Sequence, residues 1–92
     1  MIKFYMRIEI KAGFIKDLKT VPKDFREKIA GIIGTMEHCS NLSSLTGIKK
    51  LKGYQNFYRI QVGAYRLGFV LEENTIVLVR FLHKKEIYRF FP

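Results

Sequence analysis

The second half of the chain carries cationic side chains and a tyrosine whose spacing suits a nucleic-acid site. Alternation along a predicted strand at 57–62 turns Arg59 away from the core. Arg66 takes the same face on the next strand, beside Gly68, whose missing side chain leaves room for a ligand or another backbone. A tail folded across this face would add Lys84, Lys85 and Tyr88. Such a group suits RNA, because cations clamp phosphates and an aromatic ring stacks on an unstacked base.

The charge of the chain also favours a polyanionic partner. Its 92 residues hold 17 Lys and Arg against 8 Asp and Glu, a net charge of +9. No acid occurs between Glu37 and Glu72. The cations within that gap are Lys49, Lys50, Lys52, Arg59 and Arg66. An unopposed positive surface of this kind attracts a nucleic acid first and an acidic protein second.

The sequence offers little to hold a metal or a nucleotide. It has one cysteine and two histidines, His38 and His83 lie far apart, and no CxxC or HExxH spacing is present. The glycine loops GxxxxGK[ST] and GxGxxG are missing, and paired carboxylates are too scarce for a two-metal nuclease. We therefore expect no metal and no cofactor, and we expect His83 to be either structural or a proton carrier.

Length and composition predict one folded domain over residues 1–92. A chain of 10.9 kDa buries about two thirds of its surface, which is enough for one core. No apolar stretch approaches the roughly 20 residues of a membrane span. The lone Cys39 cannot form an internal disulfide, and the N-terminus lacks the pattern of a signal peptide. We expect a cytoplasmic protein without membrane association, in which Cys39 is a small buried hydrophobe.

The apolar pattern of the first half predicts a strand and two helices. Residues 2–10 alternate and are rich in Ile, Phe and Tyr, which indicates a strand. Residues 11–20 place Phe14, Ile15 and Leu18 on one face of a short helix. A second helix begins at Pro22, and its glycines at 31 and 34 are expected to allow close packing on a sheet. Its apolar stripe comprises Phe25, Ile29, Ile32, Ile33 and Met36.

The second half reads as consecutive strands. The expected strands are 48–52, 57–62, 65–71 and 75–82, and the short connections between them require antiparallel neighbours. A helical turn and a tail follow at 83–92. The predicted fold class is α+β, with two N-terminal helices packed on an antiparallel sheet of four to five strands and a short C-terminal helical turn.

The second half also resembles a known family. The segment KKLKGYQNFYRIQVGAYRLGF at 49–69 and the ending HKKEIYRFFP are similar to the RelE/ParE superfamily of toxins from bacterial toxin-antitoxin systems. The resemblance implies a small α+β toxin that is neutralised by an antitoxin encoded beside it. RelE-like members cut messenger RNA in the ribosomal A site, whereas ParE-like members inhibit DNA gyrase.

The resemblance assigns roles to particular residues. It places RelE-like active positions at Arg59, Arg66, Lys84 and Tyr88, and a cation that grips the RNA backbone at Lys52. Three positions depart from the pattern: the family often has Lys at 59 and Arg at 84, and a second family lysine falls on Gln61. Lys and Arg are not equivalent, because only Arg offers a planar fork to two phosphate oxygens.

The expected activity is a ribosome-dependent, metal-independent cleavage of messenger RNA by attack of the RNA 2′-hydroxyl. The expected catalytic residues are Arg59, Arg66, Lys84 and Tyr88, and the expected RNA-binding residues are Lys49, Lys50, Lys52, His83 and Lys85. Two alternatives stay open: a ParE-like inhibitor of gyrase, and an inert member that only binds its antitoxin. The expected partners are an acidic antitoxin, messenger RNA on the ribosome, and operator DNA through the antitoxin alone.

Overall fold

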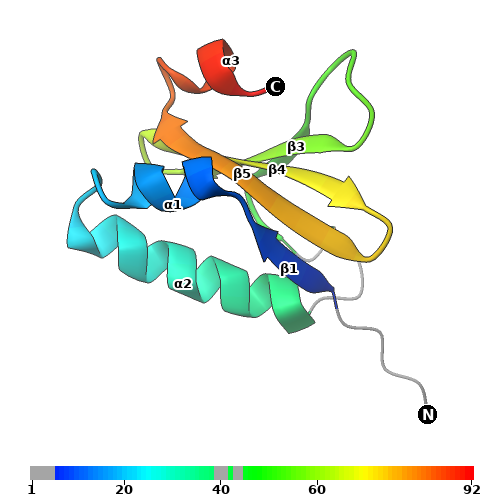
Figure 1. Ribbon diagram of the computed structural model, residues 1–92, viewed down its shortest axis with the longest axis horizontal. Coiled ribbons are helices and arrows are strands. Elements are labelled where there is room, and N and C mark those ends of the chain that lie inside the picture. Colours follow the sequence, from blue (N-terminus) through cyan, green and yellow to red (C-terminus); the bar gives the residue numbers. More distant parts are fainter. Residues whose placement is uncertain (1–5, 39–41, 43–44) are drawn as a thin grey trace.

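The computed structural model describes residues 6–38, 42 and 45–92, so Cys39 and the start of the first expected strand lie outside the described residues. Two helices cover one face of a five-stranded sheet, and a short third helix lies on the other face (Figure 1). The elements are β1 (Arg7–Ile10), α1 (Ala12–Leu18), α2 (Lys23–His38), β2 (Ile48–Lys50), β3 (Phe57–Val62), β4 (Tyr65–Glu72), β5 (Thr75–His83) and α3 (Ile87–Phe90).

The strands follow the order β1-β5-β4-β3-β2 across the sheet. The pairs from β2 to β5 are antiparallel, and two-residue turns join β3 to β4 and β4 to β5. Gly63 and Glu73 have positive φ in these turns, at 59° and 55°. The expected fold class is therefore confirmed, with one difference: β1 joins β5 in parallel. A helical connection allows β1 to run parallel or antiparallel to its neighbour in the sheet, whereas a tight turn would require antiparallel strands.

The core lies between the sheet and the two long helices. Phe14 of α1 and Ile29 and Met36 of α2 are buried against the apolar face of β3, β4 and β5. In β5 the register skips a residue, since Gly68 pairs with position 80 and Phe69 pairs with position 78. This bulge at 79 puts side chains three residues apart, at 78 and 81, on the same buried face.

Two details of the helical layer differ from the expectation. Ile15 was expected on the buried face of α1 but is 47% exposed, while Asp17 is buried. The carboxylate of Asp17 accepts hydrogen bonds from β5, and this polar anchor sets which side of α1 faces the sheet. The expectation of close packing at Gly31 and Gly34 is wrong, because a Cβ at either position would meet nothing within 4 Å.

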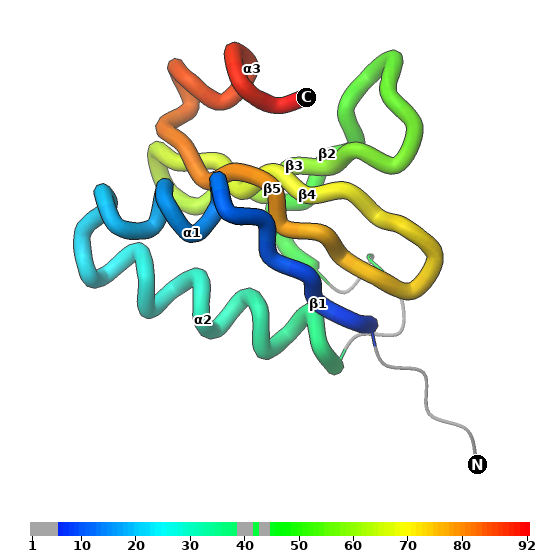
Figure 2. The backbone as a smooth tube through the Cα atoms, in the orientation of Figure 1, coloured from blue at the N-terminus to red at the C-terminus, as the bar shows by residue number. Residues whose placement is uncertain are grey.

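The C-terminal segment folds back onto the sheet. After α3 the chain continues to Phe91, whose side chain is buried on the face opposite α1 and α2. The ring of Phe91 lies over Gly68 of β4, and its centroid is 5.6 Å from that of Phe57 in β3. The loop between β2 and β3 rises beside this segment (Figure 2). The face that bears Arg59 is therefore covered in part by the tail, as the sequence indicated.

Candidate RNA-binding face

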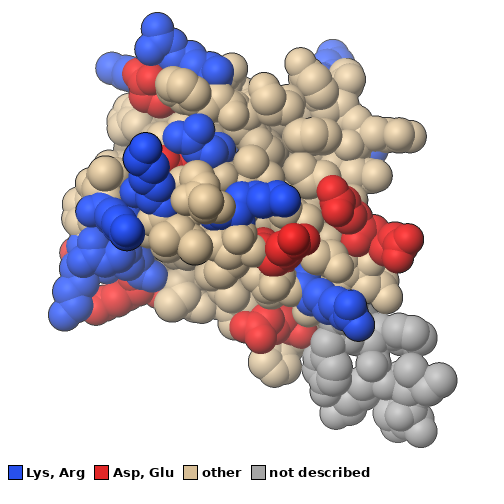
Figure 3. All heavy atoms as spheres, in the orientation of Figure 1, with Lys and Arg blue, Asp and Glu red and all other residues tan. Residues whose placement is uncertain are grey.

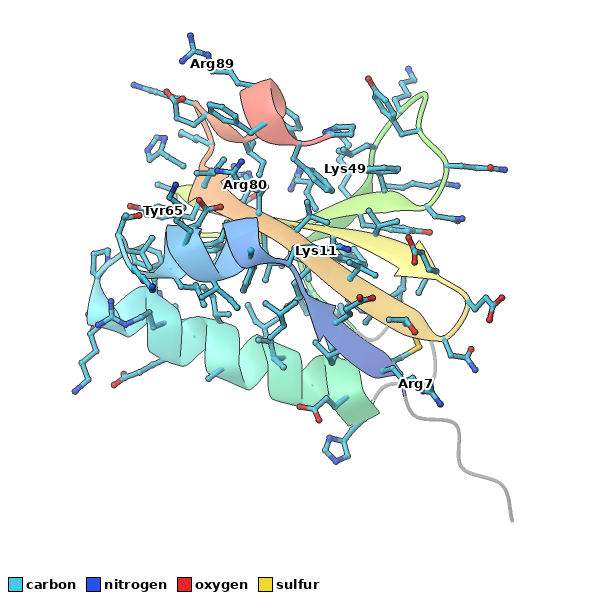
Figure 4. The ribbon with its side chains drawn as sticks, in the orientation of Figure 1. Arg7, Lys11, Lys49, Tyr65, Arg80 and Arg89 are labelled. Atoms are coloured by element: carbon cyan, nitrogen blue, oxygen red, sulfur yellow. The ribbon has the colours of Figure 1, made fainter. Side chains whose placement is uncertain are left out.

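A row of cations crosses the sheet on the side of α3. Strand register places Lys49 opposite Arg59, Arg59 opposite Gly68, and Gly68 opposite Arg80. Figure 4 shows Lys49 on the α3 side of the sheet and Arg80 between α1 and α3. The row is interrupted only where Gly68 leaves space for the ring of Phe91. We call Lys49, Arg59 and Arg80 the cation row.

Arg59 lies at the centre of this row and has an unsatisfied nitrogen. Among the described residues its Nε is buried without a hydrogen-bond partner. A buried donor left unpaired costs about 1–3 kcal/mol. Lys49 lies directly across the strand pair from Arg59, and like charges in that relation repel. Both features make the site favourable for an anion.

Arg66 lies on the same face, at the start of β4. In the register of β3 and β4 it pairs with Gln61, the uncharged residue at a position where the family pattern has a lysine. It lies diagonally across the two strands from Arg59. Its Nη1 donates to the carbonyl oxygens of Gly63 and Tyr65, both at 2.9 Å. Among the described residues these bonds use a single nitrogen, which leaves Nη2 and Nε of the guanidinium for a phosphate.

The segment from β5 to α3 returns to the same end of the sheet. The backbone N–H of Lys84 donates to the carbonyl of Ala64 at 2.8 Å, beside the turn that anchors Arg66. The side chains of Lys84 and Lys85 are exposed. The structure therefore brings Arg66 and Lys84 to one turn region, as the predicted site requires.

His83 faces the other way. Its register partner is Tyr65, whose ring meets the imidazole edge-on with centroids 5.7 Å apart. The backbone N–H of Lys85 donates to His83 Nδ1 at 3.1 Å. Because Nδ1 accepts, a neutral His83 carries its proton on Nε2.

Tyr88 and Lys52 line one pocket of about 260 Å³ beside the cation row. The loop between β2 and β3 forms one wall and the C-terminal segment forms the other, so residues 36 positions apart in the sequence meet there. Lys50 is different, because its register partner Tyr58 packs on the core side. The structure therefore brings together Lys49, Lys52, Arg59 and Tyr88, and leaves Lys50 on the opposite face.

The charge is distributed unevenly over the molecule. Figure 3 shows Lys and Arg gathered most densely over α1, the start of α2 and the turn before α3. Exposed cations of this region include Lys16, Lys19, Lys23, Lys84 and Lys85, together with Arg89 of α3. Three of these cations come from the first half of the sequence. The positive surface is therefore wider than we expected from the cations of the second half alone.

The described part of the chain contains no group of three or more His, Cys, Asp and Glu side chains placed to hold a metal ion. No helix among the described residues is long and apolar enough to cross a membrane.

Comparison with known proteins gives the family. Residues 8–88 match the family model described as the ParE toxin of the type II toxin-antitoxin system, parDE. The chain belongs to the RelE/ParE superfamily of toxins. It is 46% identical over 91 residues to Toxin RelE3 of Methanocaldococcus jannaschii, covering 95% of this chain and all of that one. It is also 30% identical over 80 residues to Putative toxin RelE1 of the same organism, covering 86% and 89% of the two chains.

Solved structures agree with this membership. The toxin superposes on a chain of the RelB-RelE antitoxin-toxin complex from Methanococcus jannaschii with a TM-score of 0.81 and 43% identity, covering 91% and 99% of the two chains. A more distant neighbour is the archaeal RelE-RelB complex from Pyrococcus horikoshii, with a TM-score of 0.73, 19% identity and coverage of 87% and 96%. The second match shows the fold alone.

The toxin contains one ion pair that the sequence reasoning missed. Arg80 donates through Nε to Asp17 Oδ2 at 2.8 Å and through Nη2 to Oδ1 at 3.0 Å. The same carboxylate accepts the backbone N–H of Phe81 at 2.9 Å. A signal was present: Asp17 is the only acid among the apolar positions of α1, and Arg80 is the only charge in the apolar run of β5.

Arg80 also reaches the C-terminal helix. Its guanidinium carbon lies 5.1 Å from the centroid of the Phe90 ring. The hydrogen bond to Asp17 is the main cause that raises the pKa of Arg80, and partial burial opposes it. Because the raised pKa keeps Arg80 charged wherever the toxin is folded, loss of the Arg80 proton would weaken this ion pair only in strong alkali. Arg80 thus connects α1, β5 and α3.

Proposed function

We propose that this toxin cuts messenger RNA on the ribosome. The observation that carries the proposal is the pairing of Lys49 with Arg59 across β2 and β3, next to a pocket that contains Tyr88. A fold gains nothing from two like charges placed opposite one another. An RNA phosphate between them would remove the repulsion.

The proposed chemistry uses a nucleophile that the substrate supplies. The 2′-hydroxyl oxygen attacks the adjacent phosphorus, the bond to the 5′-oxygen breaks, and the products are a 2′,3′-cyclic phosphate and a free 5′-hydroxyl. Arg66 stabilises the charge that develops on the phosphoryl oxygens. Lys84 protonates the leaving oxygen, while Tyr88 orients the nucleotide and is the candidate to accept the 2′ proton.

The arrangement of the groups gives the ribosome a role. Arg66 and Lys84 lie at the β3–β4 turn, whereas Tyr88 and Lys52 lie at the pocket beside the loop. An RNA strand must therefore bridge two parts of one face in an extended, defined conformation. A message held by the ribosome is already oriented, and orientation supplies a large part of the reduction in barrier.

The experiment maps the 5′ ends of messenger RNA on translating ribosomes with the wild-type toxin and with Arg66→Ala. We expect new ends carrying 5′-hydroxyls for the wild type, and at least a 100-fold lower yield for Arg66→Ala, since removal of one stabilising donor typically costs that much. Arg7→Ala is the matched control, because Arg7 is exposed on β1. Growth arrest with intact messages would contradict the proposal.

A second candidate is inhibition of DNA gyrase. It is favoured by the matched family model, which is that of ParE, and by the uncharged Gln61 next to Arg66. This candidate predicts gyrase-linked DNA breaks in cells whose messages stay intact. A toxin that binds its antitoxin but neither cuts messenger RNA nor inhibits gyrase would be the inert alternative named in the sequence analysis.

We also propose an acidic antitoxin as the partner of this toxin in the cytoplasm, with any contact to operator DNA made through that antitoxin. Two facts support it: the net charge of +9, and the likeness to chains solved as RelB-RelE complexes. Co-expression with the reading frame beside the toxin gene tests this. We expect a stable complex and restored growth; growth arrest that persists despite expression of the neighbouring protein would contradict it.

A further inference from the structure

The pocket beside the cation row has two aromatic walls. Tyr54 enters it from the loop between β2 and β3, and Tyr88 enters it from α3. Both rings are more than half exposed, at 51% and 58%. The other lining residues are Leu51, Lys52, Phe91 and Pro92. Two exposed rings that border one small pocket offer flat surfaces to a flat ligand.

The wall that carries Tyr54 is fixed in place. Its ring centroid is 5.8 Å from that of Phe57, and Phe57 in turn packs on Phe91. The loop is closed by a hydrogen bond from the N–H of Leu51 to the carbonyl of Phe57 at 2.8 Å. Gly53 has φ of +82°, a conformation that favours glycine and that turns the chain just before Tyr54. The pocket is therefore preformed.

We propose that this pocket receives one unstacked base of the RNA, which stacks against Tyr54 and Tyr88 while Lys52 binds an adjoining phosphate. The inference rests on the proposed function for the identity of the RNA and adds Tyr54 to its binding residues. The volume supports a single base, since about 260 Å³ is below the ~300–1,000 Å³ of pockets that hold drug-sized ligands. The apolar side chains of Leu51 and Pro92 also line the pocket and suit contact with the edge of a base.

The aromatic walls of the pocket, and not its charge, favour RNA over an acidic peptide as the occupant. Cations on the approach to the pocket, Lys49 and Lys52, would attract either ligand. Two tyrosine faces, however, add stacking energy only for an aromatic group, and in single-stranded RNA every residue supplies one. Stacking is tolerant of sequence, so the pocket positions a nucleotide whichever base it holds.

The test uses a six-nucleotide single-stranded RNA that carries the fluorescent base 2-aminopurine, titrated with full-length toxin at low salt. Stacking quenches this fluorophore, so binding in the pocket lowers its emission. We expect Tyr54→Ala and Tyr54→Leu to weaken binding about 5- to 150-fold, which corresponds to the ~1–3 kcal/mol of one base stacked on an aromatic ring. Tyr54→Phe should bind within twofold of wild type.

The controls separate stacking from phosphate binding and from misfolding. Gln55→Ala changes the adjacent loop residue, which does not line this pocket, and should leave affinity and quenching unchanged. An abasic oligonucleotide of the same length should bind wild type and Tyr54→Leu equally. Tyr54→Leu keeps an apolar side chain against Phe57, and its thermal midpoint shows whether it is folded.

Three outcomes would overturn the inference. They are unchanged RNA affinity and quenching in Tyr54→Leu, an equal loss for the abasic oligonucleotide, and an effect of Tyr54→Leu on poly-glutamate binding but not on RNA. These results are distinct from failure of the proposed function. Cleavage on ribosomes without quenching would reject the pocket alone, and quenching without cleavage would reject the nuclease alone.

Discussion

The ring of Phe91 lies directly on the backbone of Gly68. A Cβ at position 68 would come within 2.6 Å of Phe91 Cδ2 and 2.8 Å of its Cγ, closer than real side chains allow. The contact holds the C-terminal segment against β4, between Arg59 on one side of Gly68 and Arg80 on the other. Tyr88 is carried by the same segment, so its position depends on this contact.

Gly68→Ala should displace Phe91 and with it the pocket wall. We expect a loss of about 1–3 kcal/mol in the free energy of unfolding, as for other overpacked sites. Messenger RNA cleavage should fall at least tenfold, although residue 68 carries no chemistry. Urea unfolding and 5′-end mapping measure the two effects.

The matched control for this substitution is Gly34→Ala. A Cβ there meets nothing within 4 Å and the position is inside α2, so the change should stabilise the toxin by about 1 kcal/mol. Full activity in Gly68→Ala would show that the position of the C-terminal segment is unimportant for the reaction.

Arg59→Met should uncouple stability from activity. The substitution removes a buried Nε that has no partner among the described residues and keeps the apolar stem, so the unfolding free energy should stay unchanged or rise by about 1 kcal/mol. RNA binding should weaken because a phosphate contact is lost. Arg7→Met on β1 is the control and should alter neither. A strongly destabilised Arg59→Met would mean that Arg59 has a structural role.

Neighbouring lysines on β2 should differ in the salt dependence of RNA binding. Lys49 lies in the cation row and Lys50 pairs with Tyr58 on the other face. Each phosphate contact to single-stranded nucleic acid contributes about 0.7 to the slope of log K against log salt. Lys49→Gln should therefore lower the slope by about 0.7, while Lys50→Gln leaves it unchanged. Equal slopes for the two variants would mean that the face assignment is wrong.

Asp17→Asn should destabilise the toxin by about 3 kcal/mol, because it leaves Arg80 without its ion-pair partner in a largely buried position. A double-mutant cycle with Arg80→Met measures the coupling energy of the pair. Glu27→Gln provides the comparison, since Lys23–Glu27 is an exposed pair at 3.8 Å and its loss should cost less than about 1 kcal/mol. A coupling energy no larger than that of the exposed pair would contradict the anchoring role of Asp17.

Much of the sheet could be predicted because its strands are joined by short turns. The alternation in 57–62 gave the bounds of β3 and the outward face of Arg59, and both agree with the structure. Alternation could not place Arg80, because the bulge at 79 shifts the phase of β5 by one residue. Such a shift depends on the partner strand, which a local pattern does not contain.

The helical layer and the tail depend on contacts between residues far apart in the sequence. Periodicity put Ile15 on the buried side of α1, but the hydrogen bonds from β5 to Asp17 decided the orientation. The sequence leaves Tyr54 in the connection between two expected strands, and only the packed C-terminal segment shows that it borders a pocket. The cations themselves could be identified in the sequence. Their grouping on one face or around one pocket depends on the tertiary structure.

The parallel pairing of β1 with β5 constrains the order of folding during synthesis. The first described strand must wait for the last strand, β5, since Arg7 pairs with Thr75 and Ile10 with Leu78. The cation row also needs β5, because β5 supplies Arg80. The Phe91 ring that lies over Gly68 in this row comes from the segment after α3. Long-range pairing of this kind is slow to form, because a long loop must close before the contacts are gained. A ribosome that translates this message therefore finishes most of the chain before the product has an assembled cation row.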